Sequence, residues 1–288
     1  MDLYFIVFAF LTILSSASVL LIATIGLAVI FGMMGIINLA HGEFIMLGAY
    51  ATLISVRAGI PFPVAVLLAG FILAVFGAVV ERLIMRFLYG RLLDTLLATW
   101  GLSMALYQTA ILVFGATTPG IGLPISAVSI GTYTLSLYFL LLILIAAILV
   151  FAVYLVFTRT SYGVMARAAI QNPTMAAAVG IETKKINTIT FAVGSALAGI
   201  AGGLLVPAYP ATPNMGLAFV SKAFLSVVVA GPLTISGTIA SVGALGSLSS
   251  FASSFLTSVL GDITFFALTI IVLRFFPNGI SVHWRGKL

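Results

Sequence analysis

A cluster of polar side chains interrupts a long apolar stretch near the start of the sequence. Asn38, His41 and Glu43 fall between apolar runs on both sides, and Gly35 and Gly42 accompany them. An amide, an imidazole and a carboxylate at this spacing can hydrogen-bond a polar solute or relay a proton. They can equally satisfy the backbone groups that a break in a helix leaves free. The rest of the chain must explain why such groups stand here.

The composition is that of an integral membrane protein. The chain is 62% hydrophobic and 6% charged, whereas soluble domains are roughly 45–50% apolar and about 25% charged. At about 20 residues per span, the 288 residues can hold eight spans. The net charge of +6 reflects bases in the loops between apolar runs. This pattern favours membrane orientation and contact with lipid, not binding to nucleic acid. There are no cysteines, which excludes disulfides.

At membrane depth the polar cluster is expensive. A charged group near the bilayer centre costs about 2.5–3.5 kcal/mol, and such groups usually face a cavity, a partner helix or a transport path. We therefore predict that the break lines a route for a small polar solute, as discontinuous helices do in transporters. For Asn38 we favour a structural role, as the cap of a half-helix that begins at Leu39. For the other polar groups both roles remain open. The predicted pathway residues are Asn38, His41, Glu43, Gly42 and Gly35.

The elements that position this cluster are expected to be helices, because a backbone exposed to lipid must satisfy its own hydrogen bonds. The fold class is an all-α polytopic transmembrane bundle of about eight spans with discontinuous helices, in one domain over residues 1–288. In addition to the apolar runs, a weak Ser/Gly-rich run lies near 241–260. The small residues of 194–203 are expected to allow close helix packing. The apolar runs are 4–31, 39–56, 62–81, 95–114, 135–157, 187–208, 219–240 and 263–276.

Charge asymmetry predicts the orientation in the membrane. The segments 82–94 and 158–187 and the carboxyl-terminal tail are basic, whereas 115–134 and 209–221 carry no aspartate, glutamate, lysine or arginine. The positive-inside rule places the basic segments in the cytoplasm. The amino terminus is then outside and the carboxyl terminus cytoplasmic. We expect an even number of crossings, most simply eight, or ten if the glycine-rich breaks conceal half-spans.

Six other charged groups have ordinary interpretations. Glu81 with Arg82, and Arg91 with Asp94, are expected to form pairs at the membrane interface. Lys222 is expected to extend to lipid headgroups. Asp262 is expected to be solvated in a turn between weakly apolar runs.

The segment 158–187 predicts a short, well-delimited helix. Asn172 can cap it, Pro173 suits its first position and Gly180 suits its end, around an alanine-rich core. A second short helix is expected over Ser161 to Ile170 and carries Arg167. Such a rigid element on a membrane surface can dock into a groove on a partner. It can also merely connect two spans, and both interpretations remain open at this point.

Enzyme signatures are absent from the sequence. There is no G-x-x-x-x-G-K-[ST] phosphate loop, and the two histidines, His41 and His283, lack the spacing of metal ligands. No serine belongs to a nucleophile elbow. We therefore expect a conduit and neither an enzyme nor a metalloprotein. The rival to be kept is a proton-coupled secondary transporter that uses Glu43 and His41 as a relay.

Several segments together resemble the permease subunits of ABC importers for branched-chain amino acids, urea and short amides. The run G-x-x-N-x-A-H-G-E of that family is matched from Gly35 to Glu43. Counterparts also exist for TLLATWG (95–101), for 167–181, for TFAVGSALAGIAGGLL (190–205) and for the FPNG sequence at 276–279. The similarity extends over most of the chain.

The resemblance implies a transport subunit without enzymatic activity of its own. It implies a homologous second permease subunit, two cytoplasmic ATPase subunits and an extracytoplasmic solute-binding protein, in a bacterial-type inner membrane. No cofactor would be bound directly, since ATP belongs to the ATPase subunits. The segment 158–187 then falls where such permeases dock on the ATPase. The coupling residues implied are Arg167, Asn172, Pro173, Ala176, Ala177 and Gly180.

The substrate class is divided between two branches of that family. LLATWG, and Gln171-Asn172 with Met175-Ala176, resemble the urea and amide branch, whereas Lys222-Ala223-Phe224 resembles the amino-acid branch. We lean slightly to urea or a short amide. The chain also departs from the family's Gly-Gly-x-Gly turn, because it has Gly231-Pro232 there.

Overall fold

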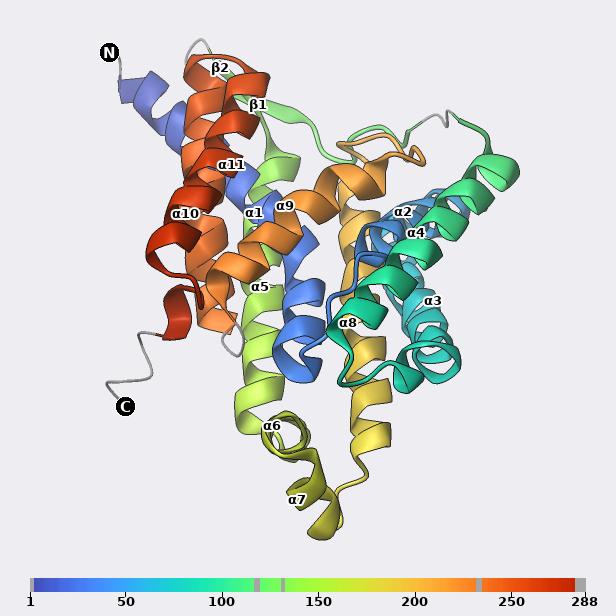
Figure 1. Cartoon of the computed structure of the whole chain (residues 1–288). Coiled ribbons are helices and arrows are strands. Elements are labelled where there is room, and N and C mark those ends of the chain that lie inside the picture. The colour runs from blue at the N-terminus through green and yellow to red at the C-terminus, as the bar shows by residue number, and fades with distance from the viewer. Residues whose placement is uncertain (1–2, 117–119, 131–132, 232–234, 283–288) are drawn as a thin grey trace.

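The computed structural model describes residues 3–116, 120–130, 133–231 and 235–282 and confirms an all-α membrane bundle (Figure 1). Seven of its helices are long and apolar enough to cross a membrane. These are α1 (Leu3–Met34), α3 (Phe62–Leu83), α4 (Leu92–Phe114), α5 (Leu137–Arg159), α8 (Thr183–Leu205), α10 (Ile235–Phe255) and α11 (Ser258–Phe275).

The remaining elements are shorter. Two apolar helices, α2 (His41–Arg57) and α9 (Met215–Ala230), have 17 and 16 residues. A 3-10 turn, η1 (Met85–Phe87), follows α3, and two small helices, α6 (Ser161–Gln171) and α7 (Pro173–Ala178), follow α5. Strands β1 (Ala127–Ile130) and β2 (Tyr133–Ser136) pair antiparallel, with Ala127 opposite Ser136. This two-stranded pairing, in the neutral segment 115–134, is an element that the sequence analysis did not predict.

Helix α8 lies at the centre of the bundle and packs against α1, α2 and α3. Its small residues allow the close approach that the sequence predicts. A Cβ at Gly202 would lie 1.9 Å from the carbonyl oxygen of Ile45 on α2, and one at Gly199 would lie 2.8 Å from that of Ala69 on α3. The backbones of these helices therefore touch, and no larger side chain fits between them.

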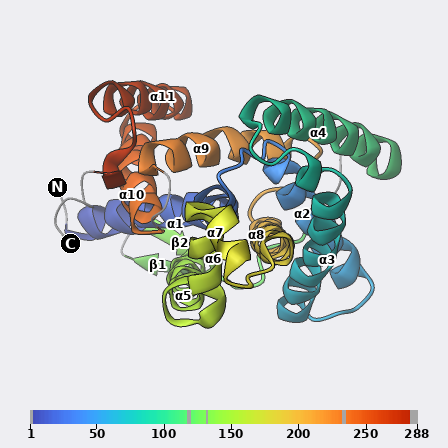
Figure 2. The same ribbon diagram turned by 60° about the horizontal axis from the view of Figure 1, so that its bottom comes forward.

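The two ends of the bundle are chemically different. Figure 1 shows the strands β1 and β2 and the start of α1 at one end, which we name the hairpin end. Helices α6 and α7 protrude at the opposite end, which we name the loop end. Seen from the loop end in Figure 2, α6 and α7 lie near the middle of that face, beside α8. The basic segment 158–187 therefore lies at the end opposite to the neutral segment 115–134.

The expected run 219–240 is wrong as a single span. The structure divides this region into α9 and α10, and the weak Ser/Gly-rich run near 241–260 belongs mostly to the long helix α10. Hydropathy undervalues α10 because its small polar residues lie against neighbouring helices. Ser249, for example, is buried and donates a hydrogen bond to the carbonyl of Gly261 on α11 at 2.9 Å.

The expected eight crossings and the expected placement of the termini are incompatible, because an even number of crossings returns a chain to its starting side. In the described residues, seven helices are long and apolar enough to cross a membrane, and α2 and α9 are shorter. The structure therefore agrees with a bundle of about eight spans. Termini on opposite sides require an odd number of crossings, and their placement stays a prediction.

The departure at Gly231-Pro232 is only partly visible, since Pro232 lies outside the described residues, as do His283, Arg285 and Lys287. Gly231 has a φ of 84° and ends α9. A Cβ at Gly279 would lie 2.4 Å from the Cα of Gly231. The closing FPNG sequence thus packs directly on the C-terminal end of α9.

Candidate functional site

The helix break lies between α1 and α2 and is tied by hydrogen bonds to α4 and to the middle of α1. The Leu39 backbone N–H donates to the Thr99 hydroxyl at 3.1 Å, and the Ser103 hydroxyl donates to Glu43 Oε1 at 3.0 Å. Thr99 and Ser103 are four residues apart and therefore share one face of α4. His41 Nε2 lies 3.1 Å from the carbonyl oxygen of Ala23 on α1. Hydrogen bonds to α4 and to α1 therefore hold the break in place.

The start of α2 differs from the sequence prediction. The helix begins at His41 and not at Leu39, and its N-cap, Ala40, has no side-chain cap. Asn38 acts one step earlier, because its Oδ1 accepts a hydrogen bond from the Ala40 N–H at 3.1 Å. This is an Asx turn, in which a short polar side chain holds its own backbone. The structural role that we favoured for Asn38 is consistent with this geometry.

The structure brings four of the five predicted pathway residues together in one buried segment. Asn38, His41 and Glu43 are at most 3% exposed, and a Cβ on Gly42 would lie 2.3 Å from the Gly216 carbonyl oxygen of α9. Gly35 is separate, because it is exposed and turns the chain after α1 with a φ of 65°.

Each of the three buried polar side chains keeps one atom without a protein partner among the described residues. These atoms are Asn38 Nδ2, His41 Nδ1 and Glu43 Oε2. Buried polar atoms nearly always have partners, so three unpartnered atoms near one helix break are an unusual concentration of unused hydrogen-bonding capacity. Direct contact with solute remains a prediction for these residues.

The predicted short helices in segment 158–187 are confirmed as α6 and α7. Asn172 Oδ1 accepts from the Met175 N–H at 3.0 Å, which caps α7, and Pro173 is its first residue. Gly180 has a φ of 89° and ends the turn after α7. Arg167 donates from Nη1 to the carbonyl oxygen of Phe157, so that α6 is tied to the end of α5.

Most of α7 faces away from the bundle. Of the residues implied for coupling, Asn172, Pro173, Ala177 and Gly180 are exposed and only Ala176 is buried. Two apolar side chains on this surface are also exposed, Met175 by 61% and Val179 by 71%. A capped helix with apolar groups at its tip, outside any membrane-length span, is a surface suited to a protein partner.

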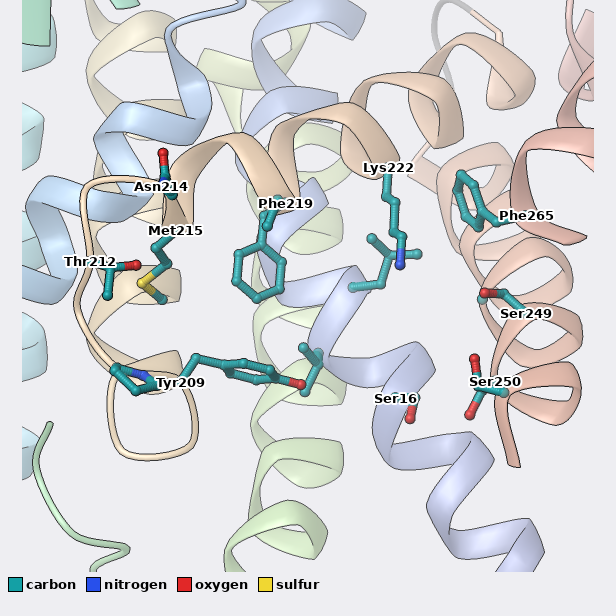
Figure 3. Close-up of a pocket in the computed structure, with 16 residues that line it drawn as sticks. Ser16, Tyr209, Thr212, Asn214, Met215, Phe219, Lys222, Ser249, Ser250 and Phe265 are labelled. Atoms are coloured by element: carbon teal, nitrogen blue, oxygen red, sulfur yellow. The ribbon is translucent and has the colours of Figure 1, made fainter. Parts of the chain in front are cut away.

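A cleft lies elsewhere, among α1, α9, α10, α11 and the chain between α8 and α9 (Figure 3). Its volume is about 560 Å³. Tyr209, on its wall, also lines a second cleft with Thr134 and Ser136 of β2, which places the larger one toward the hairpin end. The polar lining of the larger cleft consists of Ser16, Tyr209, Thr212, Asn214, Lys222, Ser249, Ser250 and Ser253.

An ion pair lies at the edge of this cleft, with Lys222 on the cleft wall and Asp262 beside it. Lys222 Nζ on α9 lies 2.6 Å from Asp262 Oδ1 on α11. The expected turn at Asp262 is wrong, because Asp262 lies within α11. Lys222 pairs with it here, and its contact with lipid headgroups stays a prediction. Sequence reasoning missed the pair because 40 residues separate its members. The available signal was two opposite charges, each alone in an apolar run.

The two other expected pairs have different outcomes. Arg91 and Asp94 form an ion pair at 3.7 Å. Glu81 instead accepts hydrogen bonds from the hydroxyls of Tyr89 and Thr188. The carboxylate is buried, whereas Arg82 is exposed.

Comparison with known proteins places this geometry in context. The model of a family described as "Branched-chain amino acid transport system / permease component" matches residues 9–273. The chain is 29% identical to the high-affinity branched-chain amino acid transport system permease protein BraD of Pseudomonas aeruginosa, over 93% of this chain and 92% of the relative. It is also 29% identical to the corresponding LivH protein of Escherichia coli K12, over 96% of each. No solved structure matches the chain significantly.

Proposed function

Because the chain belongs to the permease family of branched-chain amino acid ABC importers, we propose that it carries a branched-chain amino acid across the membrane. The match over residues 9–273 carries this proposal, since it spans all seven long helices up to the last turn of α11. The chain is a multi-pass membrane subunit and not an enzyme. The slight lean of the sequence toward urea or a short amide has no support in the comparisons, whose named relatives transport branched-chain amino acids.

The family implies ATPase subunits and a solute-binding protein as partners. We propose a homologous second permease subunit and two ATPase subunits in the assembly. The hairpin end then faces outward and meets the binding protein, and the loop end faces the cytoplasm. The basic charges of 158–187 support this orientation, because cytoplasmic loops are enriched in lysine and arginine.

In this scheme the solute enters at the hairpin end and passes the break at Asn38–Glu43. The break is firmly anchored to α1 and α4, so its polar groups are held in fixed positions. ATPase motion enters through α7 and reaches the bundle through α6 and α8, which flank it in the chain. A proton relay through His41 and Glu43 is not favoured, because an ABC permease is driven by its ATPase.

The substrate is tested with the complete importer in proteoliposomes. Uptake of leucine and of urea is measured with ATP inside and the binding protein outside. We expect leucine uptake that depends on ATP and that excess unlabelled valine inhibits. ATP-driven uptake of urea without uptake of leucine would overturn the proposed substrate.

Coupling is tested at Gly180. Gly180→Ala places a side chain in the left-handed region, which costs about 1–2 kcal/mol locally and shifts the end of α7. Gly59→Ala is the matched control, because Gly59 has the same φ of 89° and the same open surroundings, but lies between α2 and α3.

We expect Gly180→Ala to retain ATP hydrolysis and lose most leucine uptake, whereas Gly59→Ala transports normally. Ala177→Pro, which disrupts α7 itself, should act as Gly180→Ala does. Normal transport by both Gly180→Ala and Ala177→Pro would contradict the coupling role of α7.

A further inference from the structure

The cleft near the hairpin end combines an apolar wall with a small number of polar groups. Val19, Leu20, Met215, Phe219 and Phe265 supply the apolar surface. Binding pockets for small molecules typically have volumes of about 300–1,000 Å³ and this kind of lining. The volume of about 560 Å³ therefore fits a small organic solute.

The ion pair at this cleft is unusual for its position. Charged side chains in membrane helices are expensive, and those that persist usually mark a substrate path. Lys222 also lies outside the basic segments that set the orientation. The positive-inside rule therefore does not account for a cation at this position.

The pair remains accessible and has unused hydrogen-bonding capacity. The side chains of Lys222 and Asp262 are 32% and 53% exposed, and one contact of 2.6 Å joins them. An ammonium group has three donors, and a carboxylate has two oxygens with about four acceptor positions. Figure 3 shows Lys222 extending from α9 into the cleft, between Phe219 and Phe265. A ligand there can reach a charge and an apolar surface at once.

We propose that this cleft is a binding site for a zwitterionic amino acid. The Lys222 ammonium holds the α-carboxylate of the ligand, the Asp262 carboxylate holds its α-ammonium, and the apolar wall receives its aliphatic side chain. The inference rests on the proposed function and deepens it, because it names the groups that recognise the substrate. Urea has no formal charge and no aliphatic chain, and it would gain nothing from this arrangement.

A purely structural ion pair between α9 and α11 would give part of the same phenotype, so the two roles must be separated. Lys222→Met and Asp262→Asn each remove one charge. The double variant Lys222→Asp with Asp262→Lys restores the attraction between the helices but reverses the direction of the zwitterion relative to the apolar wall. A structural role predicts that the double variant transports normally, whereas recognition predicts that it assembles but transports poorly.

Uptake is measured with the complete importer at saturating binding protein. We expect each single variant to raise the leucine concentration for half-maximal uptake, or lower the uptake rate, by about tenfold or more. The charge-reversed double variant should retain the melting temperature of the wild-type complex and still show the defect. If it recovers wild-type uptake, the pair is structural and the proposed site is wrong.

A direct binding test uses the absence of cysteine from the chain. Ser16→Cys places a single thiol on the cleft wall, and Ser254→Cys places one on the exposed surface of α10, away from the residues that line the cleft. A small thiol reagent modifies both in the nanodisc-embedded importer. Leucine should slow the modification at position 16 at least threefold and leave position 254 unchanged.

The protection must depend on the pair. Adding Lys222→Met to Ser16→Cys should abolish it. Leucine uptake by the wild-type importer without any protection at position 16 would overturn the site and leave the proposed function intact. Absence of leucine uptake would remove the proposed function, and the site would fall with it.

Discussion

Glu81 joins three segments near the loop end of the bundle. Its carboxylate, on α3, accepts hydrogen bonds from Tyr89 after η1 and from Thr188 on α8, the latter at 2.5 Å. The Thr188 hydroxyl has a second acceptor within reach, the Lys184 carbonyl, whereas the Tyr89 hydroxyl donates to Glu81. The sequence indicated only a charge at the end of an apolar run. The partners come from segments that fold back from elsewhere, so a pattern of neighbours in the sequence does not reveal them.

We predict that Glu81→Ala lowers the free energy of unfolding by about 1–2 kcal/mol, because it leaves the partly buried Tyr89 hydroxyl without this acceptor. Glu81→Gln keeps one acceptor oxygen and should cost about half as much. Asp94→Asn is the control, because Asp94 belongs to an exposed pair and its change should stay within about 0.5 kcal/mol. Denaturant titration of the permease in detergent measures all three. Equal losses for Glu81→Ala and Asp94→Asn would contradict the assignment.

Tyr89 should add a pH dependence to the same cluster. Burial, and then the hydrogen bond to Glu81 and its charge, raise the pKa of the Tyr89 phenol above its usual value. The folded state therefore holds this proton more tightly than the unfolded chain does. The stabilisation is complete below about pH 10, the pKa of an unfolded tyrosine, and declines as the pH rises further. The stability difference between wild type and Tyr89→Phe should be constant from pH 6 to 9 and shrink above 10. A decline of this stability difference already at pH 7 would contradict the raised pKa of Tyr89.

At the scale of helices, the contact of α2 with α8 depends on glycine. A Cβ at Gly202 would lie 1.9 Å from the Ile45 carbonyl oxygen, so Gly202→Ala must push the two backbones apart. We predict a loss of stability of at least about 1–3 kcal/mol. Gly101→Ala on α4 is the matched control, since a Cβ added at Gly101 would have nothing within 4 Å; it should be neutral. Thermal unfolding in one detergent compares the two, and equal melting temperatures would show that α2 and α8 do not touch here.

The cap of α7 provides a second test at this scale. Asn172→Ala removes the acceptor for the Met175 N–H, and the loss of an N-cap costs about 0.5–2 kcal/mol. In so short a helix this loss should unfold α7 and reduce coupled leucine uptake. Asn172→Ser should restore uptake. Thr257→Ala removes the equivalent cap of α11, where Thr257 accepts from the Leu260 N–H at 3.3 Å, and should not affect coupling. Full uptake by Asn172→Ala would mean that α7 need not be ordered.

The contrast between α7 and α10 shows which elements the sequence predicts. The start, end and exposure of α7 depend on neighbouring residues, from Asn172 to Gly180, so all the necessary information is local. Helix α10 is held by contacts that its own composition does not reveal, such as that of Ser249 with Gly261. For the same reason the motif at Asn38–Glu43 was recognised as a helix break, whereas the Lys222–Asp262 pair was not. That pair forms only after α9, α10 and α11 have packed.

At the scale of the whole molecule, the number of passes fixes the relation between the two termini. Seven helices of membrane-spanning length and the shorter α2 and α9 separate Tyr4 at the start of α1 from Val282 near the end of the described chain. If both short helices also cross, the number of crossings is nine, and an odd number places these two residues on opposite sides of the membrane. The positive charges of 158–187 then decide which side is which. Thus α2 and α9, though short, are decisive for the topology.

We predict that single cysteines report this topology directly, because the chain has none of its own. Tyr4, Thr134, Ala177 and Val282 are all exposed. In intact cells, a membrane-impermeant thiol reagent should modify Tyr4→Cys and Thr134→Cys. It should reach Ala177→Cys and Val282→Cys only after the membrane is permeabilised. Modification of positions 4 and 282 from the same side would mean that α2 or α9 does not cross. Modification of position 177 from outside would reverse the orientation and place α7 out of reach of any cytoplasmic ATPase.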